Sequence, residues 1–160
     1  MSDEFSALVL LADGDAPQRD AALQRFEDRW SADSLVMNSW FTAQASASRD
    51  GVPGEVLRLA QHPQFDASNP NKIRALFSAF AVNPRHFHAA DGSGYALLAD
   101  RIIEVDSGNP IFAGRLARSF NAWRRHDPER QGRCETQLRR ILEIDGLSRN
   151  TFEIISKTLA

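Results

Sequence analysis

The sequence predicts an all-α protein, and three observations lead to that fold class. Apolar residues recur at intervals of three and four along nearly the whole chain, the spacing that places side chains on one face of an α-helix. Asparagine or aspartate stands directly before proline at several points, a combination typical of helix starts. No alternation of apolar and polar residues continues for five or more positions, so no convincing strand is expected.

The apolar stripes define the expected helices in chain order. They run through Leu23, Phe26 and Trp30; Leu35, Val36, Trp40 and Phe41; Ile73, Leu76, Phe77 and Phe80; Leu98, Ile102 and Val105; Phe112, Leu116 and Phe120; Leu138, Ile141 and Leu142; and Phe152, Ile155 and Leu159. We expect each stripe to face the protein core.

Capping residues and glycines mark where these helices begin and end. Helix starts are predicted at Asn69-Pro70, Asn83-Pro84, Asn109-Pro110 and Asp127-Pro128, with two more near Asp15 and Ser148. Each offers a side-chain oxygen for backbone N–H groups of the first helical turn. Breaks are predicted at Gly14, Gly51, Gly92 to Gly94 and Gly146.

The resulting architecture is about eight or nine helices joined by short loops, most of them roughly 10 to 17 residues long. Short loops make neighbouring helices pack as antiparallel pairs. We expect successive pairs to stack in a curved layer of the HEAT or armadillo kind, an α-α superhelix. No low-complexity linker interrupts the chain, so residues 1–160 are predicted to form a single helical domain.

Composition favours a soluble protein of ordinary balance. Apolar residues make up 42% and charged residues 25%, and the formal net charge is −2, which gives no strong attraction to nucleic acid or to an anionic membrane. No apolar stretch is long enough to span a membrane, and the run from Ala7 to Ala12 follows acidic residues, unlike a signal peptide. Cys134 is the only cysteine. We therefore expect a cytoplasmic location.

No metal site is expected in this chain. The histidines are His62, His86, His88 and His126, and none belongs to an HExxH pair. His86 and His88 lie in a short turn with no third ligand in sight, so a structural role is favoured. His62 precedes Pro63 at a helix end, where an imidazole suits the last carbonyls of the helix.

No catalytic nucleophile is expected either. Cys134 lies among arginines, which favour a thiolate, but it shares a helical face with Leu138 and Ile141, so a buried packing thiol is the better interpretation. Ser93 has a glycine on each side but lacks the GxSxG pattern and the preceding strand of a nucleophile elbow. A helix-initiating turn capped by Asp91 or Ser93 is predicted instead.

Charge is distributed unevenly. Residues 1–60 carry ten acids and five bases, whereas residues 115–160 carry ten bases and six acids, with Arg115, Arg118, Arg124 and Arg125 clustered. A basic cluster can bind phosphates, a carboxylate or an acidic neighbouring domain, although most such arginines form a solvated helix face. Arg115 is the exception, because it stands near a helix start outside the apolar stripe. There it can project into a cleft and bind a carboxylate.

Several segments resemble a known family. These are residues 26–45 (FEDRWSADSLVMNSWFTAQA), 59–95 (LAQHPQFDASNPNKIRALFSAFAVNPRHFHAADGSGY), 109–116 (NPIFAGRL), 124–131 (RRHDPERQ) and 147–160 (LSRNTFEIISKTLA). From Phe26 onward they are similar, in order, to the C-terminal helical domain of bacterial aminopeptidase N, a gluzincin zinc metallo-aminopeptidase. The resemblance implies that the chain is a fragment of a larger multidomain enzyme.

The resemblance also implies a function. In this family an upstream catalytic domain holds zinc and removes N-terminal amino acids from peptides, and its HExxH and GxMEN motifs are absent from these residues. The C-terminal helical domain closes over the active-site chamber and admits short peptides. By position Asn109, Ile111 and Arg115 match the stretch that faces the chamber. Ile111 replaces a polar residue of some relatives, which implies a more apolar wall.

The partners implied are upstream domains of the parent protein and short peptides, in a monomer without nucleic acid or membrane. Two alternatives stay open. A free-standing helical-repeat scaffold would bind a protein partner on its concave face. Nucleic-acid binding through the basic C-terminal third is weaker, because its aromatic residues fit the core stripes.

Overall fold

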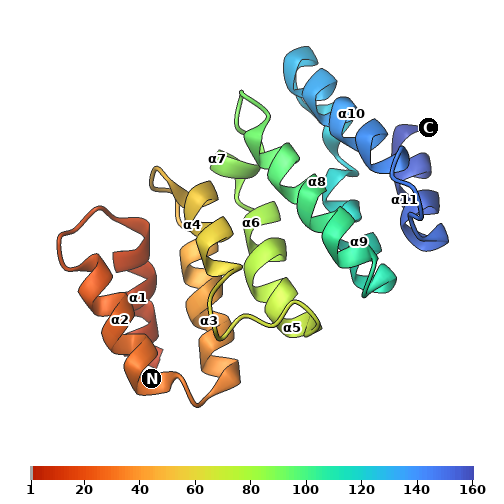
Figure 1. Ribbon diagram of the computed structural model, residues 1–160. Coiled ribbons are helices and arrows are strands. Elements are labelled where there is room, and N and C mark those ends of the chain that lie inside the picture. Colours follow the sequence, from red (N-terminus) through yellow and green to blue (C-terminus); the bar gives the residue numbers. More distant parts are fainter. Residues whose placement is uncertain (1) are drawn as a thin grey trace. The chain divides into compact units, whose positions relative to one another are not determined.

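The regular structure of the protein is entirely helical. The computed structural model describes residues 2–160, and this range contains helices, turns and loops but no strand (Figure 1). The prediction of an all-α fold is therefore confirmed. The helices belong to two compact units, Met1–Asn83 and Pro84–Ala160, each with its own buried apolar residues.

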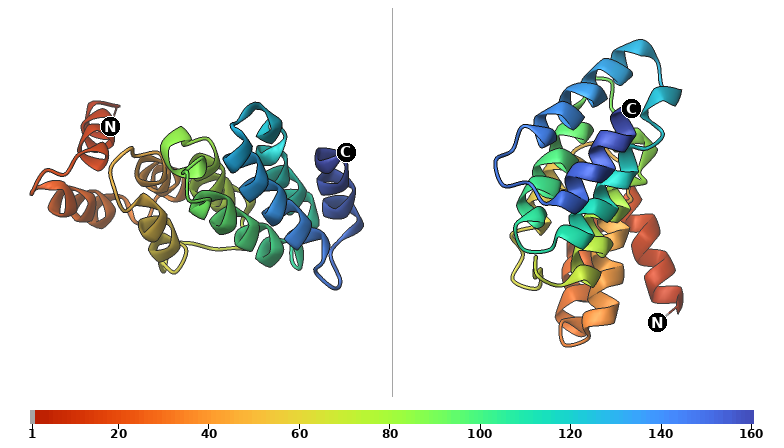
Figure 2. Two further views of the ribbon diagram at one scale, coloured as in Figure 1. Left: turned by 90° about the horizontal axis from the view of Figure 1, so that it is seen from above. Right: turned by 90° about the vertical axis from the view of Figure 1, so that its right-hand side faces the viewer.

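The first unit begins with two helical hairpins. Its first helices are α1 (Ser2–Asp13), α2 (Arg19–Trp30), α3 (Ser34–Ala45) and α4 (Val52–Leu59). α2 packs against α1 and α3, and α3 also packs against α4. Figure 2 shows α1 and α2, in red and orange, as neighbours at the N-terminal end. Because the joining loops are short, successive helices are antiparallel, as the loop lengths predict.

A third helical rod completes the first unit. α5 (Pro70–Ile73), the π-helical segment η1 (Arg74–Ser78) and α6 (Ala79–Ala81) follow one another without a break. The hydroxyl of Thr42 in α3 donates a hydrogen bond of 3.0 Å to the carbonyl of Ala75. This contact ties the π-helical segment, a rare conformation, to α3.

Side-chain caps fix the starts of two helices in this unit. Asp33 and Asn69 accept hydrogen bonds from first-turn N–H groups of α3 and α5. The start predicted near Asp15 is wrong, because α2 begins at Arg19. The N–H of Arg19 donates to the carbonyl of Ala16 at 2.9 Å, so a tight turn precedes the helix.

The core of the first unit largely follows the predicted stripes, although Trp30 is only half-buried. The stripe Ile73, Leu76, Phe77 and Phe80 is buried, as are Val36, Trp40 and Phe41. Leu35 is 75% exposed, so its placement in the core was wrong. It lies two residues after the Asp33 cap, and the helix that starts there turns Val36 and Met37 inward instead.

The second unit contains four longer helices and three short ones. They are α7 (Pro84–Phe87), α8 (Ser93–Asp106), α9 (Pro110–Ala117), the 3₁₀ segments η2 (Arg118–Phe120) and η3 (Trp123–Arg125), α10 (Pro128–Leu142) and α11 (Arg149–Leu159). α8 packs against α9 and α10, and α11 packs against the same two helices. Figure 2 shows α10 and α11, both blue, as neighbours.

The turn before α8 requires glycine at two positions. Gly92 has a φ of 75°, which favours glycine. A Cβ on Gly94 would lie 2.5 Å from the carbonyl oxygen of Phe87 and even closer to that of His86. The Asp91 carboxylate accepts from the N–H and hydroxyl of Ser93 at 2.9 and 2.7 Å, which confirms the predicted helix-initiating turn.

The remaining caps and stripes of this unit are also largely confirmed. Asn109, Asp127 and Ser148 accept first-turn hydrogen bonds in α9, α10 and α11. The buried positions include Leu98, Ile102, Val105, Phe112, Leu116, Phe120, Leu138 and Ile141. Phe152, however, is 49% exposed, so its core assignment was wrong. Its neighbour Thr151 takes the inward position.

Candidate functional site

The predicted site begins with Asn109, which shapes the start of α9. Its N–H donates to the carbonyl of Val105 at 2.7 Å, and its side-chain oxygen accepts from the N–H of Phe112 at 3.1 Å. Pro110 occupies the first turn, where its missing N–H needs no partner. Asn109 therefore turns the chain from α8 into α9 and sets the direction of the residues that follow.

Ile111 and Arg115 lie on the exposed side of α9. Ile111 is 67% exposed, so most of this large apolar side chain is accessible to a ligand or to another surface. Arg115 is also exposed, and its guanidinium carbon lies 5.7 Å from the ring centroid of Phe112. Within the described part of the chain, no acidic side chain pairs with Arg115. These side chains are thus available to a ligand or to another domain.

α11 holds α9 in place from the buried side. The side-chain amide of Asn150 donates a hydrogen bond of 2.8 Å to the carbonyl of Pro110. Gly114 faces α11 so closely that a Cβ there would lie 2.7 Å from the δ-methyl of Ile154 and also against the Asn150 amide. The exposed face of α9 is therefore carried by a tightly packed helix pair.

A buried carboxylate at the end of α8 fixes the start of α11. Asp106, at the end of α8, is 4% exposed. It accepts hydrogen bonds from the hydroxyl and N–H of Ser148, at 2.6 and 2.7 Å, and from the hydroxyl of Thr151 at 2.5 Å. Three donors satisfy the charge, so the first turn of α11 is anchored beside the turn that precedes α9.

Two of the three histidines of the second unit, His88 and His126, form a packing cluster. Nδ1 of His88 lies 2.9 Å from the Tyr95 hydroxyl, and the rings of His88 and His126 have centroids 4.0 Å apart. Arg130 donates to the carbonyl of His88 at 2.7 Å. Burial lowers the pKa of His88 to about 4, and the neighbouring His126 and Arg130 add to the effect. This environment favours a neutral imidazole in a structural role.

Cys134 is a buried side chain, as its helical position predicts. It is 1% exposed, and burial raises the pKa of its thiol to about 12. A thiol held in this protonated form is a poor nucleophile.

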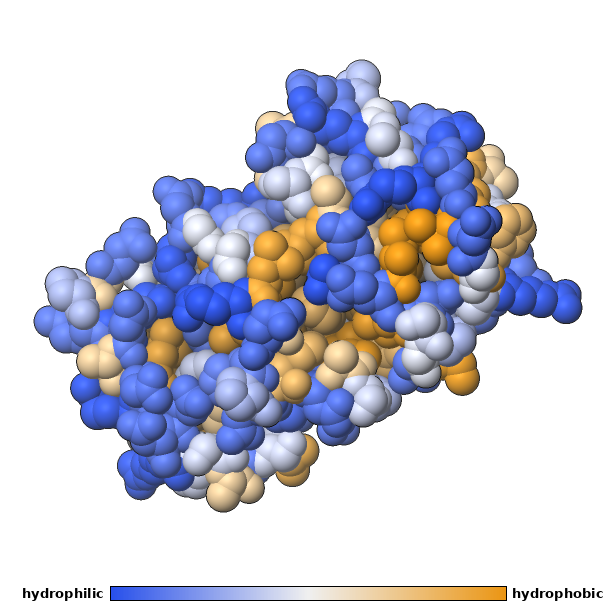
Figure 3. Space-filling view, in the orientation of Figure 1, coloured by the Kyte–Doolittle hydropathy of each residue, from blue (hydrophilic) through white to orange (hydrophobic). Residues whose placement is uncertain are grey.

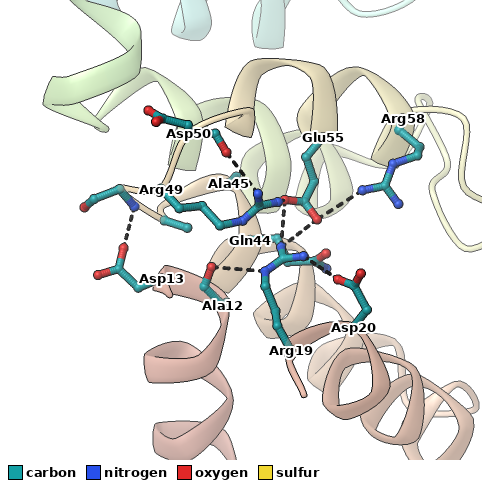
Figure 4. A network of polar contacts seen from close by, with 12 residues as sticks. Ala12, Asp13, Arg19, Asp20, Gln44, Ala45, Arg49, Asp50, Glu55 and Arg58 are labelled. Carbon is teal, nitrogen blue, oxygen red and sulfur yellow. Dashed lines mark hydrogen bonds and ion pairs between the residues drawn. The ribbon is translucent and has the colours of Figure 1, made fainter. Parts of the chain in front are cut away.

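The first unit contains a charged cluster that the sequence did not reveal (Figure 4). One guanidinium nitrogen of Arg19 donates to both carboxylate oxygens of Glu55 at 2.7 Å. Arg49 and Arg58 bind the same carboxylate. Glu55 and Arg19 are 4% and 7% exposed, and they lie 36 positions apart in the chain. No local pattern signals such a pairing, because it depends on how α2 meets α4.

The cluster lines a pocket of about 440 Å³ together with Leu23, Trp40 and His62. Nε2 of His62 lies 3.0 Å from a carboxylate oxygen of Glu27, and Nδ1 accepts from the N–H of Gln64 at 3.1 Å. His62 follows the end of α4, where it was predicted, but it pairs with a carboxylate of α2. Its polar atoms are thus used within the fold.

A second hollow of the first unit is more apolar. It has a volume of about 460 Å³ and lies between α3 and residues 70–82. Leu35 and Val82 line it and are 75% and 77% exposed. Ala75 and Ala79 also line it, together with six polar or charged residues: Asn38, Ser39, Thr42, Asn71, Arg74 and Ser78. We call this hollow the α3 groove. Figure 3 shows apolar residues interrupting the hydrophilic surface on the face seen in Figure 1.

The described residues contain neither a cluster of metal-binding side chains nor a helix that could span a membrane. Among residues 2–160, no three His, Cys, Asp or Glu side chains come together in a way that could hold a metal ion. In the same range, every helix is too short or too polar to cross a membrane.

Comparison with known proteins gives matches along the whole chain. A family model described as "Domain of unknown function (DUF3458_C) ARM repeats" matches residues 1–160. Aminopeptidase N of Caulobacter vibrioides is 41% identical over 161 residues, which cover 99% of this chain and 18% of that protein. Aminopeptidase N of Escherichia coli is 39% identical over 161 residues, with 100% and 18% covered.

A solved structure agrees with these relatives. The crystal structure of Legionella pneumophila aminopeptidase A in complex with aspartic acid superposes with a TM-score of 0.95 at 34% identity, covering 99% of this chain and 19% of that one. The ARM-repeat family description and this superposition confirm the predicted all-α superhelical class. The chain spans less than a fifth of the length of the curated relatives, 18% in each case.

Proposed function

Since the chain belongs to the DUF3458_C family of ARM-repeat domains and is a homologue of the C-terminal part of aminopeptidase N, we propose that it serves a zinc aminopeptidase as a non-catalytic domain. In this proposal it caps the active-site chamber of a longer protein, the parent protein. It admits short peptides to a catalytic domain elsewhere in the parent protein, which removes their N-terminal amino acids.

One observation carries the proposal. The chain aligns over 99% of its length with an aminopeptidase N of which it covers only 18%, so it corresponds to one part of a larger enzyme. Two candidate reactive groups of the second unit, the imidazole of His88 and the thiol of Cys134, have pKa values shifted by burial so that both are uncharged at neutral pH. Such a domain acts by shape and charge, which suits a cap that filters substrates.

The exposed side of α9 supports the substrate-facing role of Asn109, Ile111 and Arg115. Asn109 sets the direction of the helix, Ile111 offers an apolar contact, and Arg115 offers an unpaired guanidinium that suits a carboxylate. In this proposal Ile111 forms an apolar part of the chamber wall. Arg115 meets the part of a peptide beyond the first peptide bond.

The α3 groove supports contact with another domain. The groove exposes Leu35 and Val82, whose burial against another surface would be favourable, and its polar lining residues, such as Asn38 and Arg74, can hydrogen-bond to that surface. In this proposal the single helical domain of residues 1–160 packs against upstream domains of the parent protein. The parent is a cytoplasmic monomer, and its zinc is held by the catalytic domain.

An activity assay tests whether catalysis depends on a domain outside this chain. The chain, the remainder of the parent protein and the two together are each mixed with zinc and with an aminoacyl reporter or a short peptide. We expect no turnover of either substrate by the chain alone, and peptide cleavage only when both parts are present. Turnover by the chain alone that a chelator abolishes would contradict the proposal, because the chemistry would then lie in these residues.

A further inference from the structure

The arginines of the second unit differ in whether an acidic side chain neutralises them. Six pair with aspartate or glutamate at 2.5 to 2.8 Å: Arg101, Arg130, Arg133, Arg139, Arg140 and Arg149. Arg124 donates to the carbonyls of the last turn of α11. Within residues 2–160, three further exposed arginines pair with no acidic side chain: Arg115, Arg118 and Arg125. Arg125 lies in η3, so Arg115 and Arg118 are the two that belong to α9 and its continuation. Their guanidinium groups are free to bind an anion from outside the chain.

These two arginines share one face of α9 with Ile111. Arg115 follows Ile111 by four positions and Arg118 follows by seven, so the three lie on successive turns of a 3.6-residue helix. Arg118 begins η2 with φ −64° and ψ −17°, which continues the helical path. All three side chains are exposed, whereas Phe112 and Leu116 between them face the core.

Two like charges three positions apart on a helix repel each other. An anion placed between them removes the repulsion, and a carboxylate suits two guanidinium groups because each can donate paired N–H groups to it. The neighbouring Ile111 adds an apolar surface of the kind that the stem of a peptide side chain covers. The combination fits a peptide carboxylate better than a bare inorganic ion.

We propose that Arg118, with Arg115, forms a carboxylate-binding face that selects acidic peptides. The carboxylate belongs to an acidic side chain beyond the first peptide bond or to the C-terminus of a short peptide. This inference rests on the proposed function, since it assigns a substrate class to the same exposed side of α9. Arg118 determines specificity and takes no part in breaking the bond.

The test uses the full-length parent protein and four tetrapeptides. The third residue is Glu or Gln, and each peptide has either a free C-terminal carboxylate or a C-terminal amide. Values of kcat/KM are measured for the wild type, Arg118→Gln and Arg118→Glu. Arg125→Gln is the matched control, because Arg125 is also exposed but lies in η3, off the α9 face.

We expect the wild type to prefer peptides that carry a carboxylate. Loss of one charge-assisted hydrogen bond should lower that preference about tenfold in Arg118→Gln, and Arg118→Glu should reverse it. Arg125→Gln should keep the wild-type preference. Comparing Glu with Gln, and acid with amide, shows which carboxylate is bound.

Three results would overturn the inference. The first is an unchanged preference in both Arg118 variants. The second is a wild type that cleaves all four peptides equally, which would leave the proposed function intact. The third is an equal loss on every peptide with a lower melting temperature, which would mean that Arg118 docks another domain. A parent protein that cleaves none of them would instead contradict the proposed function.

Discussion

The side-chain amide of Asn150 donates a hydrogen bond of 2.8 Å to the carbonyl of Pro110, so α11 holds the first turn of α9. Gly114 lies one turn further along α9 and lets the two helices approach closely. The exposed residues Ile111 and Arg115 are therefore carried by a rigid support. Changes on the buried side of α9 should affect stability, while changes on the exposed side should affect binding.

Gly114→Ala tests the close approach of these helices. The added methyl group would meet the Asn150 amide and lie 2.7 Å from the δ-methyl of Ile154. Because both atoms are side-chain ends that can move, we expect the free energy of unfolding to fall by only about 1 kcal/mol, the low end of the usual range for overpacking. Urea denaturation of the isolated chain measures this free energy.

Gly132→Ala is the control. Nothing lies within 4 Å of a Cβ at this position inside α10, so the change should stabilise the protein by about 0.5–1 kcal/mol. If Gly114→Ala stabilised the protein as much as Gly132→Ala does, the two helices would not be in close contact at Gly114.

Glu55→Ala tests the charged cluster of the first unit. The substitution leaves Arg19, whose side chain is 8% exposed, without its buried carboxylate partner, so that only the exposed Asp20 still pairs with it. We expect a loss of about 3–5 kcal/mol, because a buried charge that loses its buried partner is strongly unfavourable. Asp20→Ala removes a partner of Arg19 whose side chain is 90% exposed, and it should change stability by less than about 0.5 kcal/mol. Similar melting temperatures for the two variants would speak against a structural role of the cluster.

His88 should make stability depend on pH. Its pKa is lowered from 6.5 to about 4 in the folded protein, mainly by burial. The unfolded chain therefore binds more protons between these values, and stability is complete above pH 6.5 and falls as the pH decreases toward 4. The slope should reach at most about 1.4 kcal/mol per pH unit. Urea midpoints measured from pH 7.5 to 4.5 give this slope. His88→Gln should flatten it, and an unchanged slope would assign the effect to other groups.

Cys134 should be unreactive in the folded protein. Burial raises the pKa of its thiol to about 12, so little thiolate is present at neutral pH. Ellman's reagent should react slowly with the native chain and rapidly in denaturant, where the only cysteine of the sequence becomes accessible. Rapid reaction in the native state would show that α10 opens or that the thiol is not buried.

Local features of the fold could be predicted from the sequence because they depend on neighbouring residues. The caps Asn69, Asn109, Asp127 and Ser148 need only a side-chain oxygen and the N–H groups of the next turn. Periodicity placed most core residues correctly. It failed for Leu35 and Phe152. Leu35 points outward because the Asp33 cap sets the start of α3, and Phe152 points outward because its neighbour Thr151 binds the buried Asp106.

Contacts between distant elements could not be predicted in this way. Glu55 meets Arg19 across 36 positions, and Asp106 meets Thr151 across 45. Both pairs depend on where whole helices pack, and a single sequence shows no sign of them. The same limit applies to the α9 face: its residues were visible in the sequence, but the structure was needed to show that Arg118 has no acidic partner within residues 2–160.

The most direct test of the account is the effect of Arg115→Ala in the full-length parent protein. KM and kcat are measured for a single-residue reporter and for peptides of two to five residues. If this chain shapes access to chemistry located elsewhere, KM should rise for the longer peptides while the values for the reporter stay the same, because the lost contact lies beyond the scissile bond. Equal changes for the reporter and for every peptide would contradict the account.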